Sequence, residues 1–227
     1  MKTISKNILV IFLSLYTFTA CEDKLELNDP NNVGDAIALI NDKNVKTTLI
    51  GAYDGLSFGS LFGGNTFRNS ELLAANGEVI FSGTFNDVSD IFRKEMITTN
   101  ADATAKWNNA YRAINIANNV LSALGVVDQE DKDQVEGEAL FIRGVLYFEL
   151  IKFFAQPYAA GNVANNPGVP IMLVDDRNST EFKARASVQE VYARIVSDLT
   201  TAEGKLAQGP NPGKASREAA AAFLSRV

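Results

Sequence analysis

The chain has 227 residues and a net charge of −6, because its 27 acidic side chains outnumber its 21 basic ones. It contains one cysteine and no histidine, which excludes an internal disulfide and any zinc site or catalytic triad that depends on histidine. The acidic balance argues against nucleic acid as a partner, since phosphate binding needs a basic surface.

Residues 1–20 are typical of a secretion signal peptide. Lys2 and Lys6 precede an apolar run at 8–20 that is shorter than the about 20 residues a helix needs to cross a bilayer. Cys21 follows a small residue, Ala20, and this pattern resembles a bacterial lipobox, in which the cysteine is acylated and becomes the first residue of the mature protein. Two or three acyl chains would anchor such a protein to a membrane. The alternative is a stray cysteine in an ordinary signal peptide.

Residues 21–41 are rich in Asn, Asp and Gly, and we expect them to form a lipidated tether. Glu22 and Asp23, directly after Cys21, resemble the surface-export signals of Bacteroidetes lipoproteins. This resemblance implies a protein anchored in the outer membrane and facing the cell exterior. The alternative is that the two acids only keep the tether solvated.

A helical pattern begins near Asn41 and extends to Leu56. Apolar residues recur there at a spacing of three to four residues, at Val45, Leu49, Ala52 and Leu56. Residues 57–92 lose this period and combine five glycines with six phenylalanines. We therefore expect a long loop region at 57–92, with one helical turn at 70–75.

The same region holds the predicted ligand site. Phenyl rings, amide groups and a guanidinium group on a glycine-rich backbone are groups that carbohydrate sites use. The candidate ligand residues are Phe62, Asn65, Phe67, Arg68, Asn69 and Asn86. The competing interpretation is that the phenylalanines only pack the loop onto the rest of the fold.

Two pairs of acids, Asp87 with Asp90 and Asp175 with Asp176, could in principle hold Ca²⁺ or hydrolyse a glycoside. Neither pair has the spacing of a ligand set, and loop acids are ordinarily solvated. We therefore predict no metal site, no cofactor and no catalytic residue.

Two long helices follow, at about 102–124 and 130–155. The first carries Trp107 and Asn118 on one apolar face, and we expect Trp107 to be a core residue rather than a sugar platform and Asn118 to be a buried amide. The second helix is apolar on two opposite faces, so it must be packed on two sides. Within it, we expect Arg143 to pair with Glu136 or another acid, because a buried charge needs a partner.

The C-terminal third contains a loop and two further helices. Residues 156–186 are expected to be a linker loop with a short extended run at 171–174. Ser187 and Glu190 then form a capping-box pattern that opens a helix. A last helix begins near Ser216, and Val227 falls inside it without a C-cap signal. We therefore expect the chain to be the N-terminal part of a longer protein.

These elements predict an all-α fold. The hairpins 102–155 and 187–227 are antiparallel helix pairs, the unit of a tetratricopeptide-type solenoid. Gly137 and Gly144, seven residues apart, would let a neighbouring helix approach closely. We expect residues 42–227 to form one domain of TPR-like antiparallel helix pairs, an α-solenoid-type scaffold with long loops.

An ordered set of short segments resembles the N-terminal half of the SusD/RagB family of outer-membrane lipoproteins. The resemblance begins with Cys21 and its acids and continues through 107–118, 137–148, 157–158, 168–170, 187–199 and 219–226. It implies a cell-surface protein that binds oligosaccharides, or other nutrients, and delivers them to a TonB-dependent, SusC-like outer-membrane transporter without breaking any bond. The alternative is a TPR-like lipoprotein that acts only as a protein–protein scaffold. A surface hydrolase that uses two carboxylates is a third hypothesis.

Overall fold

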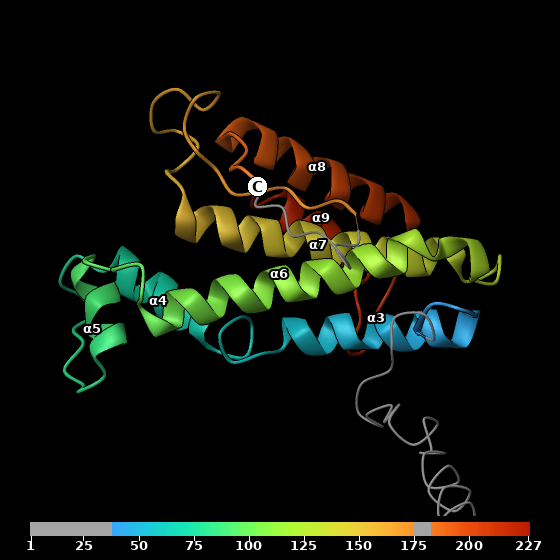
Figure 1. Cartoon of the computed structure of the whole chain (residues 1–227), viewed down its shortest axis with the longest axis horizontal. Coiled ribbons are helices and arrows are strands. Elements are labelled where there is room, and N and C mark those ends of the chain that lie inside the picture. The colour runs from blue at the N-terminus through green and yellow to red at the C-terminus, as the bar shows by residue number, and fades with distance from the viewer. Residues whose placement is uncertain (1–37, 175–182) are drawn as a thin grey trace, which may run out of the picture. The chain divides into compact units, whose positions relative to one another are not determined.

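The computed structural model describes residues 38–174 and 183–227. The predicted signal peptide, Cys21 and most of the tether lie outside these ranges, as do Asp175 and Asp176. The described residues form seven α-helices, one short 3₁₀ helix and no strand, which confirms the predicted fold class. None of these helices is long and apolar enough to cross a membrane. In chain order (Figure 1) the elements are α3 (Asp42–Leu56), α4 (Asn65–Ala74), α5 (Asn86–Arg93), α6 (Ala101–Ser122), η3 (Leu124–Val126), α7 (Lys132–Phe154), α8 (Val188–Lys205) and α9 (Arg217–Leu224).

The long helices pack in the order α3, α6, α7 and α8, with α9 against α8. Cross-helix contacts show that neighbours are antiparallel: Lys106 lies near Glu149 and Asn118 near Arg143, so α6 and α7 run in opposite directions. Figure 1 shows the same alternation in its colour order. This is the TPR-like arrangement that the sequence predicts.

Helix α7 is the central element because it is covered on two sides. Every residue from Gly137 to Ile151 is buried, between α6 on one face and α8 on the other. A Cβ atom added at Gly137 would lie 3.0 Å from Cγ of Leu206, and one at Gly144 would lie 3.0 Å from Cγ of Leu199. Both predictions for this helix, two-sided packing and close approach at the glycines, are confirmed.

The one arginine inside this helix is fully paired. Arg143 donates two hydrogen bonds to the carboxylate of Asp198 on α8, at 2.7 and 2.8 Å, and a third to Oδ1 of Asn118 on α6, at 2.8 Å. All three side chains are buried. The sequence correctly predicts an acidic partner, which is Asp198; Glu136 instead pairs with Lys205 at 3.1 Å. The expected buried amide at Asn118 is confirmed.

The helix starts follow the capping residues of the sequence. Asn41 caps α3 through its side chain, which accepts from the backbone N–H of Asn44 at 2.9 Å. Ser187 and Glu190 form the predicted capping box at α8, and Ser216 caps α9. Such caps satisfy backbone donors that the first helical turn leaves unpaired. The last helix ends at Leu224, so Val227 lies outside it, contrary to the prediction.

The expected long loop at 57–92 is wrong, because this range contains α4 and all but the last residue of α5. The predicted turn at 70–75 falls on the end of α4. This helix buries two polar residues, Thr66 and Asn69, and one apolar residue, Leu72, so its inward face is mostly polar and shows no apolar period. Leu72 packs with Val88 and Ile91 of α5 in a small core of its own. Hydrophobic periodicity does not identify a helix whose buried face is mostly polar.

The loop between α7 and α8 is held by side chains rather than by strand pairing. The described residues contain one isolated bridge, between Pro167 and Ser187, and no strand at 171–174. The hydroxyl group of Tyr111 donates to the carbonyl of Pro170 at 2.8 Å, and that of Tyr147 donates to the carbonyl of Met172 at 2.9 Å. Helices α6 and α7 therefore fix the path of this loop.

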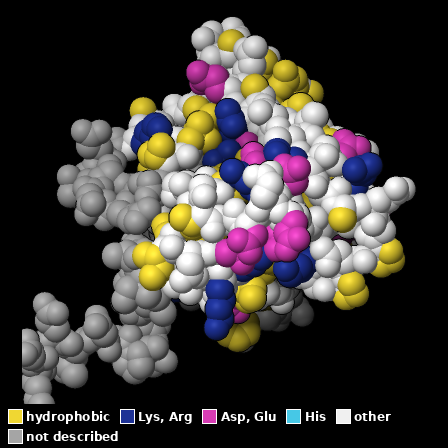
Figure 2. Space-filling view, turned by 90° about the vertical axis from the view of Figure 1, so that its right-hand side faces the viewer, with side chains coloured by type: hydrophobic (Ala, Val, Ile, Leu, Met, Phe, Trp, Pro, Cys, Tyr) yellow, Lys and Arg dark blue, Asp and Glu magenta, His cyan; other side chains and the backbone are white. Residues whose placement is uncertain are grey.

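Basic and acidic side chains are interspersed on the face shown in Figure 2. Several of them form ion pairs between elements far apart in sequence. Lys46 on α3 lies 2.5 Å from Asp131, and Lys205 on α8 lies 2.6 Å from Asp133. These pairs are partly exposed, so each adds little to stability.

Candidate functional site

The six residues predicted to bind ligand lie at the α4–α5 end of the fold. Phe62 precedes α4, four others lie on α4, and Asn86 begins α5. The rings of Phe62 and Phe67 pack edge to face at 6.1 Å. Of the six, only Phe67, Arg68 and Asn86 are exposed.

The polar groups on α4 are largely engaged within the protein. Arg68 donates from Nε to Oδ1 of Asn69 at 2.9 Å and pairs with Asp102 of α6. Asn65 also donates to Asp102, at 3.3 Å. Asn69 is 1% exposed, and its amide nitrogen has no hydrogen-bond partner among the described residues. None of the six predicted residues lines the cavity described next.

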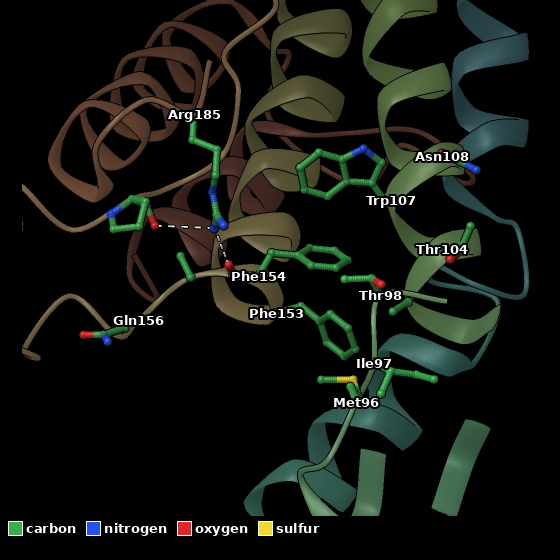
Figure 3. A pocket seen from close by; sticks show the side chains of 13 residues that line it. Met96, Ile97, Thr98, Thr104, Trp107, Asn108, Phe153, Phe154, Gln156 and Arg185 are labelled. Carbon is green, nitrogen blue, oxygen red and sulfur yellow. Dashed lines mark hydrogen bonds between the residues drawn. The ribbon is translucent and has the colours of Figure 1, made fainter. Parts of the chain in front are cut away.

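A cavity of about 660 Å³ lies at the junction of four segments. They are the residues after α5, the first half of α6, the end of α7, and the loop that carries Pro167 and Arg185. Figure 3 shows the side chains converging from these segments. The lining residues are Met96, Ile97, Thr98, Ala103, Thr104, Trp107, Asn108, Phe153, Phe154, Ala155, Gln156, Pro167 and Arg185.

One wall of the cavity is aromatic. The ring of Trp107 packs at right angles to that of Phe154, with centroids 5.0 Å apart, and Phe154 packs on Phe153 at 4.9 Å. Tyr111 lies behind Trp107 at 4.8 Å. Trp107 is half-buried, so it contacts the core as the sequence predicts and also borders the cavity (Figure 3). The wall is fixed because each ring is held by another.

Polar side chains complete the lining. Asn108 and Gln156 are exposed amides on opposite sides of the aromatic wall (Figure 3), and Thr98 and Thr104 add hydroxyl groups. Arg185 donates to the carbonyls of Phe154, at 2.5 Å, and of Gly168. It therefore satisfies the last carbonyl of α7, which the helix itself leaves unpaired, and ties the loop to the helix end.

A buried lysine supports this region from within the fold. Lys106 is 2% exposed, donates to Oγ1 of Thr66 on α4 at 2.8 Å, and lies 3.8 Å from the carboxylate of Glu149 on α7. Its ammonium group is 5.4 Å from the ring centre of Phe153. Burial lowers the pKa of Lys106 to about 8, against the opposing effect of Glu149 and with a smaller contribution from Lys152.

The free energy of unfolding is expected to rise with pH because of Lys106. In the unfolded chain Lys106 keeps its proton up to its ordinary pKa of 10.5, whereas the folded chain releases it near pH 8. The unfolded state thus binds more protons between these values, and the free energy of unfolding increases with pH there. Urea denaturation at pH 7.5 and 9.5 should show a gain of about 1–2 kcal/mol relative to Lys106→Met. If the free energy of unfolding depends on pH equally in the wild type and in Lys106→Met, Lys106 does not have a lowered pKa in the folded protein.

Sequence reasoning missed most of this cavity. Its residues come from segments that are up to about 90 positions apart, and several of them, such as Gln156 and Arg185, lie in loops. The available signal was Trp107 with Asn108, an aromatic ring and an amide next to each other at the start of α6.

Apart from Arg185, whose guanidinium group is bound to backbone carbonyls, the lining side chains are uncharged, and they suit a ligand with both apolar and hydroxyl faces. Aromatic rings stack on apolar C–H faces, while amides and hydroxyl groups exchange hydrogen bonds with hydroxyl groups. No carboxylate lines the cavity, so it offers no acid–base pair for glycoside hydrolysis. The described residues also contain no group of three side chains that could hold a metal ion.

The chain is similar to proteins of one family over most of its length. A SusD-like family model, described as "Starch-binding associating with outer membrane", matches residues 28–227. SusD-like protein P38 of Formosa agariphila is 25% identical over 206 residues, which are 88% of this chain and 38% of that protein. The chain spans 38–41% of the length of the first curated relatives that it matches.

Solved structures share the fold. A SusD superfamily protein from Bacteroides thetaiotaomicron has a TM-score of 0.75 at 27% identity, and the match covers 82% of this chain and 42% of that one. A SusD-like carbohydrate-binding protein from Bacteroides vulgatus has a TM-score of 0.70 at 24% identity, and the match covers 82% of this chain and 40% of that one. The helical packing order described above is therefore common to these proteins.

Proposed function

Because this chain belongs to the SusD-like family, we propose that it binds oligosaccharides at the cell surface and delivers them to a TonB-dependent, SusC-like transporter of the outer membrane. The protein binds its ligand without breaking a bond. The main support for oligosaccharide binding is the cavity beside Trp107, which has an aromatic wall, amides at its rim and no carboxylate. The family description supports the ligand class and the membrane association.

In this proposal the sugar ring stacks on the indole of Trp107. Its hydroxyl groups bind the amides of Asn108 and Gln156, which are exposed and free to turn toward a ligand. The rings behind Trp107 hold it in place, so little conformational entropy is lost on binding. The α4–α5 residues remain a second candidate surface, of which Phe67, Arg68 and Asn86 are exposed.

Affinity electrophoresis in gels that contain soluble starch or laminarin tests the cavity. Loss of the aromatic anchor in Trp107→Leu should weaken binding at least about tenfold, or roughly 1.4 kcal/mol. Asn108→Ala and Gln156→Ala each remove hydrogen bonds worth about 0.5–1.5 kcal/mol. The matched control is Gln129→Ala, an exposed amide that belongs to neither candidate surface, whereas Asn86→Ala tests the α4–α5 surface.

The two candidate surfaces give opposite patterns in that assay. Binding that is lost in Asn86→Ala and kept in Asn108→Ala would move the site to α4–α5. If the chain captures the transporter but is retarded in neither gel, the alternative is favoured, which is a scaffold without a saccharide ligand. The exposed side chains of Ile80 and Phe85, 76% and 74% accessible, are the observation that favours a protein partner.

We also propose that Cys21 carries the lipid anchor, which places the protein on the outer face of the outer membrane. The support is the small residue before Cys21 and the acids after it. In cells fed radioactive palmitate, Cys21→Ala should remove the label and leave an uncleaved precursor. Undiminished label in this variant would refute the anchor.

A further inference from the structure

Of the described residues that line the cavity beside Trp107, Arg185 alone carries a charge. Its Nε donates to the carbonyl of Gly168, and its Nη2 donates to the carbonyls of Phe154 and Pro167, at 2.5 and 3.4 Å. These acceptors are neutral, so they hold the guanidinium group in place without compensating its charge. A group that is already held loses little conformational entropy when a ligand binds to it.

One nitrogen of this guanidinium group is open to a ligand. Nη1 of Arg185 carries two N–H donors, and neither donates a hydrogen bond to a described residue. The acids on the helices that line the cavity have other partners. Asp102, at the start of α6, pairs with Arg68. Glu149, near the end of α7, pairs with Lys152 at 2.6 Å.

The positive charge acts on the aromatic wall of the cavity. Figure 3 shows the side chain of Arg185 extending from its loop to the end of α7, beside this wall. Burial, and to a smaller extent Tyr147, raises the pKa of Tyr111, and the charge of Arg185 opposes this rise. Because the ring of Tyr111 packs on that of Trp107 at 4.8 Å, a sugar ring stacked on Trp107 would also lie in the field of Arg185.

This arrangement favours an acidic group on the bound saccharide. A guanidinium group binds carboxylate or sulfate oxygens more strongly than neutral acceptors, because such hydrogen bonds are charge-assisted. No carboxylate among the described lining residues would repel the acidic group. We infer that the cavity prefers oligosaccharides that carry a carboxylate or sulfate group, which Nη1 of Arg185 binds while a sugar ring stacks on Trp107. The class of ligand rests on the proposed function, whereas the acidic group rests on the uncompensated charge of Arg185.

Two matched pairs of oligosaccharides test the preference by isothermal titration calorimetry. Hexagalacturonate is compared with its methyl ester, which has the same sugar chain without the charge, and sulfated laminarihexaose is compared with laminarihexaose. The wild-type chain should bind the acidic member of at least one pair roughly fivefold more tightly than the neutral member. The pair that shows the preference tells whether the acidic group is a carboxylate or a sulfate. The preference should fall between about 0.02 and about 0.5 M NaCl, because salt screens an exposed charge.

The ratio of the two affinities separates ligand binding by Arg185 from a purely structural role. Arg185→Met should reduce the ratio to about one, whereas Arg185→Lys, which keeps the charge, should retain part of it. If Arg185 only ties the loop to α7, the substitution lowers the affinity for both members of a pair alike and leaves their ratio unchanged. Lys43→Met is the control, because it removes an exposed charge on α3 outside the cavity and should not change the ratio.

The outcomes distinguish this preference from the proposed function. A wild-type chain that is retarded by starch or laminarin and does not prefer the acidic member of either pair overturns the inference and leaves the proposed function intact. A preference that persists in Arg185→Met, or that Lys43→Met abolishes, also overturns the inference, since the responsible charge then lies elsewhere. A chain that binds none of these saccharides overturns both.

Discussion

We expect Asp198→Ala to lower the free energy of unfolding by about 3–5 kcal/mol, because removal of one partner leaves a buried charge without compensation. Asp198 is 1% exposed and accepts two hydrogen bonds from the guanidinium group of Arg143, itself 5% exposed. Without the carboxylate, Arg143 keeps only Oδ1 of Asn118 as a partner. Urea denaturation followed by circular dichroism measures the change.

The double variant Arg143→Met with Asp198→Ala distinguishes a buried ion pair from simple loss of packing. It removes both buried charges and leaves only the partly exposed Arg194 without its partner Asp198, so it should be more stable than Asp198→Ala alone. Asp133→Ala is the control, because this acid pairs with Lys205 while 73% exposed and should change stability by less than about 1 kcal/mol. If Asp198→Ala and Asp133→Ala lower the free energy of unfolding by the same small amount, the hydrogen bonds of Arg143 with Asp198 do not stabilise the fold.

The second large effect is expected at the contact between α7 and α8. Gly144→Leu must place a side chain where even a Cβ atom would be 3.0 Å from Leu199 and 3.4 Å from Asp198. Overpacking of this kind costs about 1–3 kcal/mol, and here it also strains the ion pair of Asp198. The melting temperature should therefore fall by several degrees or more, at about 2–4 °C per kcal/mol for a chain of this size.

Gly204→Leu is the matched control for that substitution. Gly204 lies on α8 with no atom within 4 Å of an added Cβ, so leucine there meets open space. It also gains about 1 kcal/mol of helix propensity, because glycine is a poor helix former. The expected melting temperatures therefore move in opposite directions for the two variants. A fall of equal size in both would mean that the close approach at Gly144 is not the cause.

The scaffold could be predicted from the sequence because its signals are local. Two-sided apolar patterning identifies α7, and Ser187 with Glu190 identifies the start of α8. Each of these signals is carried by residues a few positions apart, where side-chain spacing determines which faces are buried. The acid that pairs with Arg143 could be predicted as a class but not as a residue, since Asp198 lies 55 positions away.

The binding surfaces could not be predicted in the same way. Hydrophobic periodicity does not predict helix α4 because two polar residues, Thr66 and Asn69, face inward. Thr66 accepts a hydrogen bond from Lys106 there. The sequence predicts that Trp107 packs against the core. Its position at the cavity depends on Phe154 and Arg185, which α7 and the following loop bring to it. Tertiary convergence of this kind leaves no pattern in a single stretch of sequence.

A fluorescence titration can detect a saccharide in the cavity itself, because Trp107 is the only tryptophan and borders the cavity. The chain is titrated with maltohexaose and with laminarihexaose while the emission of Trp107 is recorded. We expect a saturable change in intensity or wavelength for at least one of them, which Gln156→Ala weakens and Gln129→Ala leaves unchanged. Constant emission at concentrations where affinity electrophoresis shows full binding would contradict a saccharide site beside Trp107.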